Sequence, residues 1–149
     1  LHTNDAPSSL TRLHDLGVQP FLTAATILGV LAQRLVRKLC PHCKQETFIN
    51  EQEWKHLTFG YQTKMPSFVY KAVGCEECRQ TGYKGRVGIY EFMPISLEAK
   101  QRISAGVTLD DLKMQAKKEG IEPLRIAGAR KVLEGVTTLE EVLRVVPLN

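Results

Sequence analysis

Four cysteines, arranged as two Cys-x-x-Cys pairs, constrain this chain more than any other feature of its sequence. Cys40 and Cys43 stand in KLCPHCKQ (residues 38–45), and Cys75 and Cys78 stand in VGCEECRQTGYKG (residues 73–85). Each short loop directs two sulfurs to one point, and four thiolates about 2.3 Å from a zinc ion complete a tetrahedral site. Because such a site has no open coordination position, we expect a structural zinc ion.

The two cysteine pairs are also compatible with three other uses. Iron accepts the same four-thiolate ligand set, as in a rubredoxin-like electron carrier, and a stand-alone zinc ribbon would bind protein or nucleic acid. Two disulfides would suit a secreted protein, but the chain shows no signal peptide and we expect a reducing compartment. His42, inside the first pair, is expected to face solvent, because four sulfurs already close the site.

The charge balance gives little reason to expect a nucleic-acid partner. The net charge is only +4, from 20 Lys and Arg against 16 Asp and Glu, and Glu76 and Glu77 inside the second pair disfavour phosphate. Arg34, Arg37 and Lys38 form a short basic run. In a strand, residues 34 and 38 share one face and 37 takes the other, so we expect a solvated strand edge.

The first third of the chain reads as two helices followed by a strand. Asp5 is a helix N-cap with Pro7 in the first turn, and Gly17 suits the left-handed backbone conformation at which helices often end. Pro20 opens a second helix, for which we expect an apolar face and burial over residues 21–32. Residues 34–39 are expected to be extended and to lead directly into the first cysteine pair.

The rest of the chain predicts a short insert between strands and then a helical region. Asn50 and Glu53 form a capping box for a short helix. The insert aromatics Trp54, Phe59, Tyr61 and Phe68 either pack inside it or face a partner. Strands are expected at residues 68–73 and 85–93, the second following turns at Gly82 and Gly85. Helices are expected at 96–104, 108–119, 122–134 and 138–146, with caps supplied by Thr108 with Asp111 and by Thr138 with Glu141.

Histidines and catalytic motifs give a mainly negative result. His2 would stand at the end of a strand and beside the start of a helix, where a histidine either contacts a ligand or makes only a local hydrogen bond. We expect His14 and His56 to be boundary or surface residues. The sequence contains no G-x-x-x-x-G-K-[ST] and no G-x-S-x-G. We therefore expect no nucleotide hydrolysis by this chain alone.

The sequence begins at Leu1, not Met, and we expect it to be part of a longer protein.

Several longer stretches together resemble the C-terminal part of the type II secretion and type IV pilus assembly ATPases. These are LHTNDAPSSLTRLHDLGVQPFL, GVLAQRLVRKLCPHC, CEECRQTGYKGRVGIYEFMPI and the tail GVTTLEEVLRVV. The resemblance covers nearly the whole chain and its motifs occur in order.

The resemblance implies an α/β fold: the C-terminal part of a RecA-like ATPase core, with an inserted four-cysteine zinc-binding lobe and a helical tail. Residues 1–39 and 86–95 would belong to the core, 40–85 to the lobe and 96–149 to the helical region. Cys40, Cys43, Cys75 and Cys78 match the family's zinc ligands. His2 matches the histidine near the terminal phosphate of the nucleotide, and is thus the candidate catalytic residue.

The family also implies a setting for the complete protein. Its members bind ATP and Mg²⁺, assemble as hexamers and work at the cytoplasmic face of the inner membrane. There they associate peripherally with a membrane platform protein and couple ATP hydrolysis to pilus assembly or protein secretion. The sequence does not distinguish these two machines.

Overall fold

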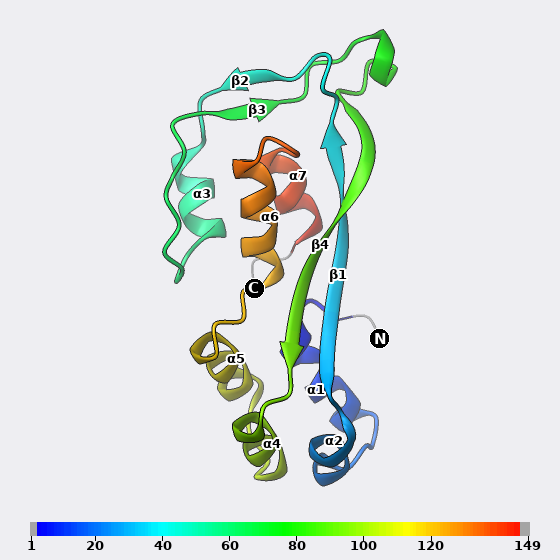
Figure 1. The fold of residues 1–149 in the computed structure, drawn as a ribbon, viewed down its shortest axis with the longest axis vertical. Helices are drawn as coiled ribbons and strands as arrows, with labels where there is room; N and C mark the ends of the chain where they lie inside the picture. The colour runs from blue at the N-terminus through cyan, green and yellow to red at the C-terminus, as the bar shows by residue number, and fades with distance from the viewer. Residues whose placement is uncertain (1–2, 147–149) are drawn as a thin grey trace. The chain divides into compact units, whose positions relative to one another are not determined.

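A computed structural model describes residues 3–146, so the prediction for His2 lies outside the described residues. Two helices open this part of the chain, the strands and the insert follow, and four helices end it (Figure 1). The elements are α1 (Ala6–Asp15), α2 (Pro20–Thr26), β1 (Gly29–Leu39), β2 (Gln45–Thr47), α3 (Glu51–Leu57), β3 (Val69–Lys71), η1 (Glu76–Cys78), β4 (Tyr83–Pro94), α4 (Leu97–Ser104), α5 (Leu109–Lys118), α6 (Leu124–Leu133) and α7 (Leu139–Val145). The fold is therefore mixed α/β.

Two compact units divide the chain. The first comprises residues 1–33 and 90–123, and the second comprises residues 34–89 and 124–149. The helical region after residue 96 is shared between them, because α4 and α5 fall in the first unit and α6 and α7 in the second.

The long strands β1 and β4 form a two-stranded sheet. They run in opposite directions (Figure 1). The backbone N–H of Ile95 donates to Leu28 at 3.0 Å, and that of Cys40 donates to Gly82 at 3.0 Å. The segment between the two strands therefore leaves and returns at the same end of the ladder, as expected for an insertion.

The predicted buried helix over residues 21–32 is wrong. Helix α2 ends at Thr26 and β1 begins at Gly29. Leu28 is 83% exposed and Leu31 is also exposed, whereas Ala32 is buried. The β-branched pair Thr26-Ile27 disfavours further helix. Position 29 of the strand favours glycine, because a Cβ atom there would lie 2.9 Å from the Phe92 ring.

The core of the first unit lies among α1, α2, α4 and α5. Its buried residues are Ala6, Leu10, Ala24, Met93, Ile95, Ala99, Ile103, Leu112 and Ala116. The predicted caps are confirmed: the Asp5 side chain accepts from the Ser8 amide, and Thr108 and Asp111 form a capping box. Gly17 has φ +101°, the left-handed geometry expected of a helix stop.

The second unit combines the insert with the last two helices. Strands β2 and β3 pair antiparallel, with Gln45 opposite Lys71 and Thr47 opposite Val69. The Asn50 side chain caps α3 as predicted. Arg125 of α6 donates from Nη1 to the Leu57 carbonyl at 2.6 Å and from Nη2 to the Phe59 carbonyl at 2.8 Å. These bonds tie the C-terminal end of α3 to α6.

Candidate metal centre

The two cysteine pairs meet where β1 ends and β4 begins. Cys40 directly follows β1, Cys75 directly precedes the single turn η1, and Cys78 is the last residue of that turn. Cys40 and Cys78 are buried, while Cys43 and Cys75 are partly exposed. The hydrogen bond from the Cys40 amide to the Gly82 carbonyl joins the first pair to the turn after the second. Local backbone structure therefore brings four sulfurs together from two distant stretches.

The spacing of the four sulfurs fits a tetrahedral metal site. All four Sγ atoms lie within 4.8 Å of one another. The distances Cys40–Cys75, Cys43–Cys78 and Cys75–Cys78 are each 3.8 Å between Sγ atoms. Sulfurs placed at the corners of a tetrahedron about 2.3 Å from its centre lie about 3.8 Å apart. At this distance none of these pairs is a disulfide, whose sulfurs would be about 2 Å apart.

Backbone amides surround the sulfurs and favour their charged form. The amide of Gly74 donates to Cys43 Sγ at 3.3 Å, and the amides of Cys75 and Gly82 donate to Cys78 Sγ at 3.3 and 3.1 Å. Burial raises the pKa of the Cys78 thiol, but hydrogen bonds from the amides of Cys75 and Gly82, together with those from neighbouring sulfurs, outweigh it and bring the pKa to about 6. Such amide–sulfur bonds are the outer contacts that orient metal-bound thiolates.

The pKa of the Cys75 thiol is shifted in the opposite direction. Burial is the main cause that raises the pKa of its thiol, to about 11, and hydrogen bonds from neighbouring sulfurs add to it. A cluster of four sulfurs cannot hold four negative charges by itself. A divalent cation would remove this repulsion, because metal binding and thiol deprotonation are coupled.

The turn after the second pair needs glycine. Gly82 has φ +83°, and a Cβ atom there would lie 2.5 Å from the Cβ of Ala72. Gly85 has φ +79°, so both predicted turn glycines are confirmed. His42 is exposed, as expected for a residue that the four-sulfur site does not need.

Lys44 bonds the first cysteine pair to the end of α6. Its Nζ donates to the Gly135 carbonyl at 3.0 Å and lies 4.4 Å from the centre of the Tyr70 ring. On the other side, the Tyr83 hydroxyl is 2.8 Å from Thr138 Oγ1 at the start of α7. The candidate metal centre is thus bonded to both C-terminal helices of its unit.

Arg37 is exposed, as expected for a solvated strand edge, but it also bonds to a buried carboxylate that the sequence did not indicate. Its Nε and Nη2 donate to Glu141 Oε2 at 3.0 and 2.8 Å, and its guanidinium lies 4.1 Å from the centre of the Tyr83 ring. Arg144 Nη2 is 2.5 Å from Glu141 Oε1. Glu141 was expected only to complete a cap with Thr138, yet its carboxylate joins β1 to α7.

Glu141 is almost fully buried, at 1% exposure. Burial raises the pKa of this carboxyl, but hydrogen bonds from Arg144 and Arg37 outweigh it and lower the pKa to about 2. A carboxyl whose pKa falls on folding stabilises the fold above its ordinary pKa, and this contribution is lost as the pH falls towards the folded value. The stabilisation by this carboxylate is therefore lost as the pH falls from about 4.5 to about 2.

Glu141→Gln should loosen α7 in the complete protein. Hydrogen bonds to charged groups contribute about 2 kcal/mol, so amide exchange over residues 139–145 should become about 30-fold faster at pH 7. This difference from the unsubstituted protein should shrink as the pH falls from 4.5 towards 2. Glu140→Gln is the matched control, because Glu140 is the exposed neighbour. Equal exchange in the two variants at pH 7 would contradict the role given to Glu141.

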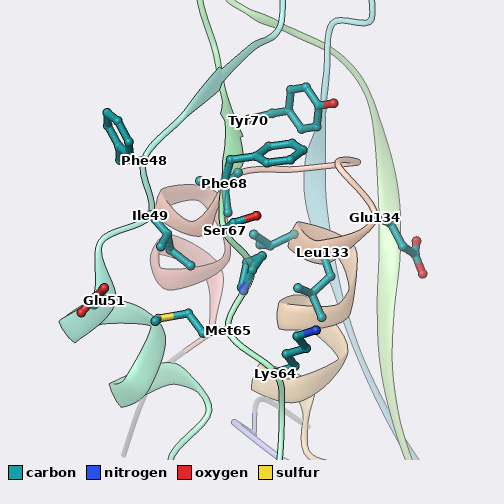
Figure 2. Close-up of a pocket in the computed structure, with 13 residues that line it drawn as sticks. Phe48, Ile49, Glu51, Lys64, Met65, Ser67, Phe68, Tyr70, Leu133 and Glu134 are labelled. Atoms are coloured by element: carbon teal, nitrogen blue, oxygen red, sulfur yellow. The ribbon is translucent and has the colours of Figure 1, made fainter.

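An open groove, lined by both apolar and charged residues, lies on the second unit beside β3 and the end of α6. Its volume is about 1150 Å3. Phe68 and Tyr70 stand close together on one side, Leu133 lies opposite, and Phe48 stands apart from them (Figure 2). Phe48 is 93% exposed. Among the insert aromatics considered in the sequence, Trp54 is buried, whereas Phe59, 78% exposed, is not part of the core.

The remaining histidines have the expected places. His14 is partly buried, with Nε2 3.2 Å from Thr23 Oγ1, and His56 is exposed. His2 precedes the residues that the structure describes. Within residues 3–146, none of the helices combines the length and apolar character needed to cross a bilayer.

Comparison with known proteins gives a family match over nearly the whole chain. A family model described as "Type II/IV secretion system protein" matches residues 1–144. The type IV pilus assembly ATPase TfpB of Acinetobacter baylyi is 72% identical over 149 residues, which is 100% of this chain and 26% of that protein. The type II secretion system protein E of Pseudomonas aeruginosa is 46% identical over 145 residues, 97% of this chain and 28% of that protein. The type IV pilus assembly ATPase PilB of Thermus thermophilus is 43% identical over 143 residues, 96% of this chain and 16% of that protein.

Proposed function

Because the chain belongs to the type II/IV secretion system protein family, we propose that it is the C-terminal part of a motor ATPase for pilus assembly or type II secretion. The observation that carries this proposal is the 72% identity over the full chain to a type IV pilus assembly ATPase. The chain spans about a quarter of that relative's length, 26%. Activity is therefore proposed for the complete protein and not for this chain alone.

We assign the first unit to a RecA-like nucleotide-binding core. The large apolar side chains that it exposes within the described residues support this assignment, because such a surface is typical of one that packs against other parts of a protein. They include Phe21, Leu28, Leu31, Tyr90 and Phe92. In the complete protein, other parts of the same core would pack on this surface.

ATP and Mg²⁺ would be bound largely by residues outside this chain, because its sequence has no phosphate-binding loop. The contribution proposed for this chain is His2, placed near the terminal phosphate by analogy with the family. A side chain that hydrogen-bonds charge as it develops on the transferred phosphoryl group accelerates hydrolysis.

Cys40, Cys43, Cys75 and Cys78 would hold one zinc ion. Bound there, zinc would supply structural cross-linking and no reaction chemistry, because four thiolates leave no position for water. The chain's own residues provide the rest of the lobe: the amides of Gly74, Cys75 and Gly82 donate to the sulfurs. A lobe braced in this way can move as one body.

The complete protein would work as a hexamer at the cytoplasmic face of the inner membrane, associated peripherally with the machine's membrane platform protein. We assign the open groove of the second unit to an exposed segment of that platform protein. Its support is the exposure of Phe48 beside a groove whose lining combines apolar side chains such as Phe68 and Leu133 with charged ones. The relatives are named as a pilus assembly ATPase and a type II secretion system protein, so we propose another component of such a machine as the partner.

One experiment tests both the motor and the groove. The complete protein should hydrolyse ATP and restore pili, or secretion, to cells that lack its gene. Phe48→Ser should retain ATP turnover within about twofold, because Phe48 is an exposed side chain with no part in the nucleotide contact proposed here. The same variant should lose most pilus assembly or secretion. The 149-residue chain alone should show no turnover.

Phe59→Ser is the matched control, because Phe59 is an exposed aromatic of the same unit that does not line the groove. It should support normal output. A complete protein without ATP turnover would contradict the motor proposal. Normal output from Phe48→Ser, or equal loss from both variants, would contradict the groove proposal alone.

A further inference from the structure

Glu91 is a buried carboxylate whose position is explained by no local pattern. It lies on β4 and is only 3% exposed. Its Oε2 accepts a hydrogen bond from the backbone N–H of Ala6, the first residue of α1, across 85 positions of sequence. Both residues belong to the first unit. The returning strand is thus bonded directly to the start of the first helix.

The first turn of α1 has all its free amide donors satisfied by carboxylates. Ala6 donates to Glu91, Pro7 has no N–H to donate, and Ser8 donates to Asp5 Oδ1 at 2.8 Å. A helix start normally presents these groups to solvent or to an anionic ligand. Here they are already bound to the protein's own anions, so they do not form a phosphate subsite.

Residues 3–5, which join His2 to α1, are bonded to the same unit by further contacts. Thr3 Oγ1 lies 2.8 Å from Ser9 Oγ, and Asp5 Oδ2 lies 3.4 Å from Lys113 Nζ of α5. With Glu91 on the Ala6 amide, the short segment after His2 is held by α1, α5 and β4 together. A displacement of β4 at Glu91 would therefore move the start of α1.

Burying a carboxylate is costly unless the charge is well compensated, and Asp5 already caps α1. Helix stability alone gives a weak reason for a second carboxylate at this place. We propose that Glu91 is a positioning residue for the reaction: it fixes the start of α1 and thereby the segment that carries His2. This inference rests on the proposed ATPase function and on the role of His2 within it.

The test is a double-mutant comparison in the complete protein. Glu91→Ala should lower kcat about tenfold with KM for ATP within about twofold, because a misplaced catalytic group loses rate more than binding. Glu91→Gln keeps an oxygen that accepts from the Ala6 amide and should recover most of the rate. In the His2→Ala background, Glu91→Ala should cause no further loss, since the two residues act through one group.

The control is Thr108→Ala, which removes the cap of α5 in the same unit, where Thr108 Oγ1 accepts from the Asp111 amide at 3.2 Å. It should leave kcat within about twofold. If Glu91→Ala does not fold, Glu91→Asp replaces it, because the shorter side chain withdraws the carboxylate from Ala6. An equal loss of kcat in both backgrounds, or no loss from any Glu91 variant, would overturn the inference.

These outcomes also separate this inference from the proposed function. A large effect of His2→Ala with no effect of Glu91→Ala overturns only the positioning role. No effect of His2→Ala on kcat removes the catalytic role of His2 and the positioning role with it. ATP turnover by the complete protein, measured in the same series, tests the motor itself.

Discussion

Cys43→Ser should leave the complete protein without its bound metal and with a loosened lobe. A serine hydroxyl cannot replace a thiolate ligand in a four-sulfur site, and the energy of metal binding is also the energy that folds the surrounding loops. We expect about one metal ion per chain in the unsubstituted protein and essentially none in the variant. Amide exchange should accelerate throughout residues 40–82, and elemental analysis with exchange measurements checks both results.

His42→Ala is the matched control for this change, because His42 is exposed between the two cysteines of the first pair. It should keep its metal and its exchange protection. Full metal content in Cys43→Ser would contradict the four-sulfur site, and metal loss in His42→Ala would show that a nitrogen ligand is used.

His2→Ala should reduce ATP turnover by the complete protein about 100-fold. The reason is that a hydrogen-bond donor aimed at developing charge typically contributes 10²-fold or more to the rate. The substitution should leave metal content and thermal unfolding unchanged, because His2 is not among the four sulfur ligands. Steady-state turnover at saturating ATP is the measurement.

His14→Ala is the control in the same unit. His14 bonds to Thr23, a local contact with no proposed part in catalysis. It should retain turnover within about twofold. Unchanged turnover in His2→Ala would reduce His2 to a local hydrogen bonder, and equal losses in both variants would indicate a general effect on the unit.

Local chemical patterns predicted a large part of this structure. The Cys-x-x-Cys spacing indicated that four sulfurs meet, and they lie within 4.8 Å of one another. The caps at Asp5, Asn50 and Thr108 were identified because a capping side chain bonds to an amide only a few residues away. For the same reason the four helices after residue 96 were placed close to their observed bounds.

Errors and omissions arose where distant residues decide the structure. The stretch 21–32 fits a helical face as well as it fits an alternating strand, and only the pairing of β1 with β4 selects the strand from Gly29 onwards. Glu141 and Arg37 are 104 positions apart, and no local pattern reveals their contact. Glu91 was missed for the same reason. For Glu91 the available signal was its place between Ile89 and Met93, on the buried face of β4.

One zinc ion per chain is the expected metal content of the complete protein, purified without added metal. This measurement tests the central structural claim, that Cys40, Cys43, Cys75 and Cys78 form one closed metal site with no catalytic position. Elemental analysis should give zinc and protein in equal amounts, and the four thiols should react with a thiol reagent only after a chelator removes the metal. Iron in place of zinc, or a metal-free protein with four freely reactive thiols, would contradict it.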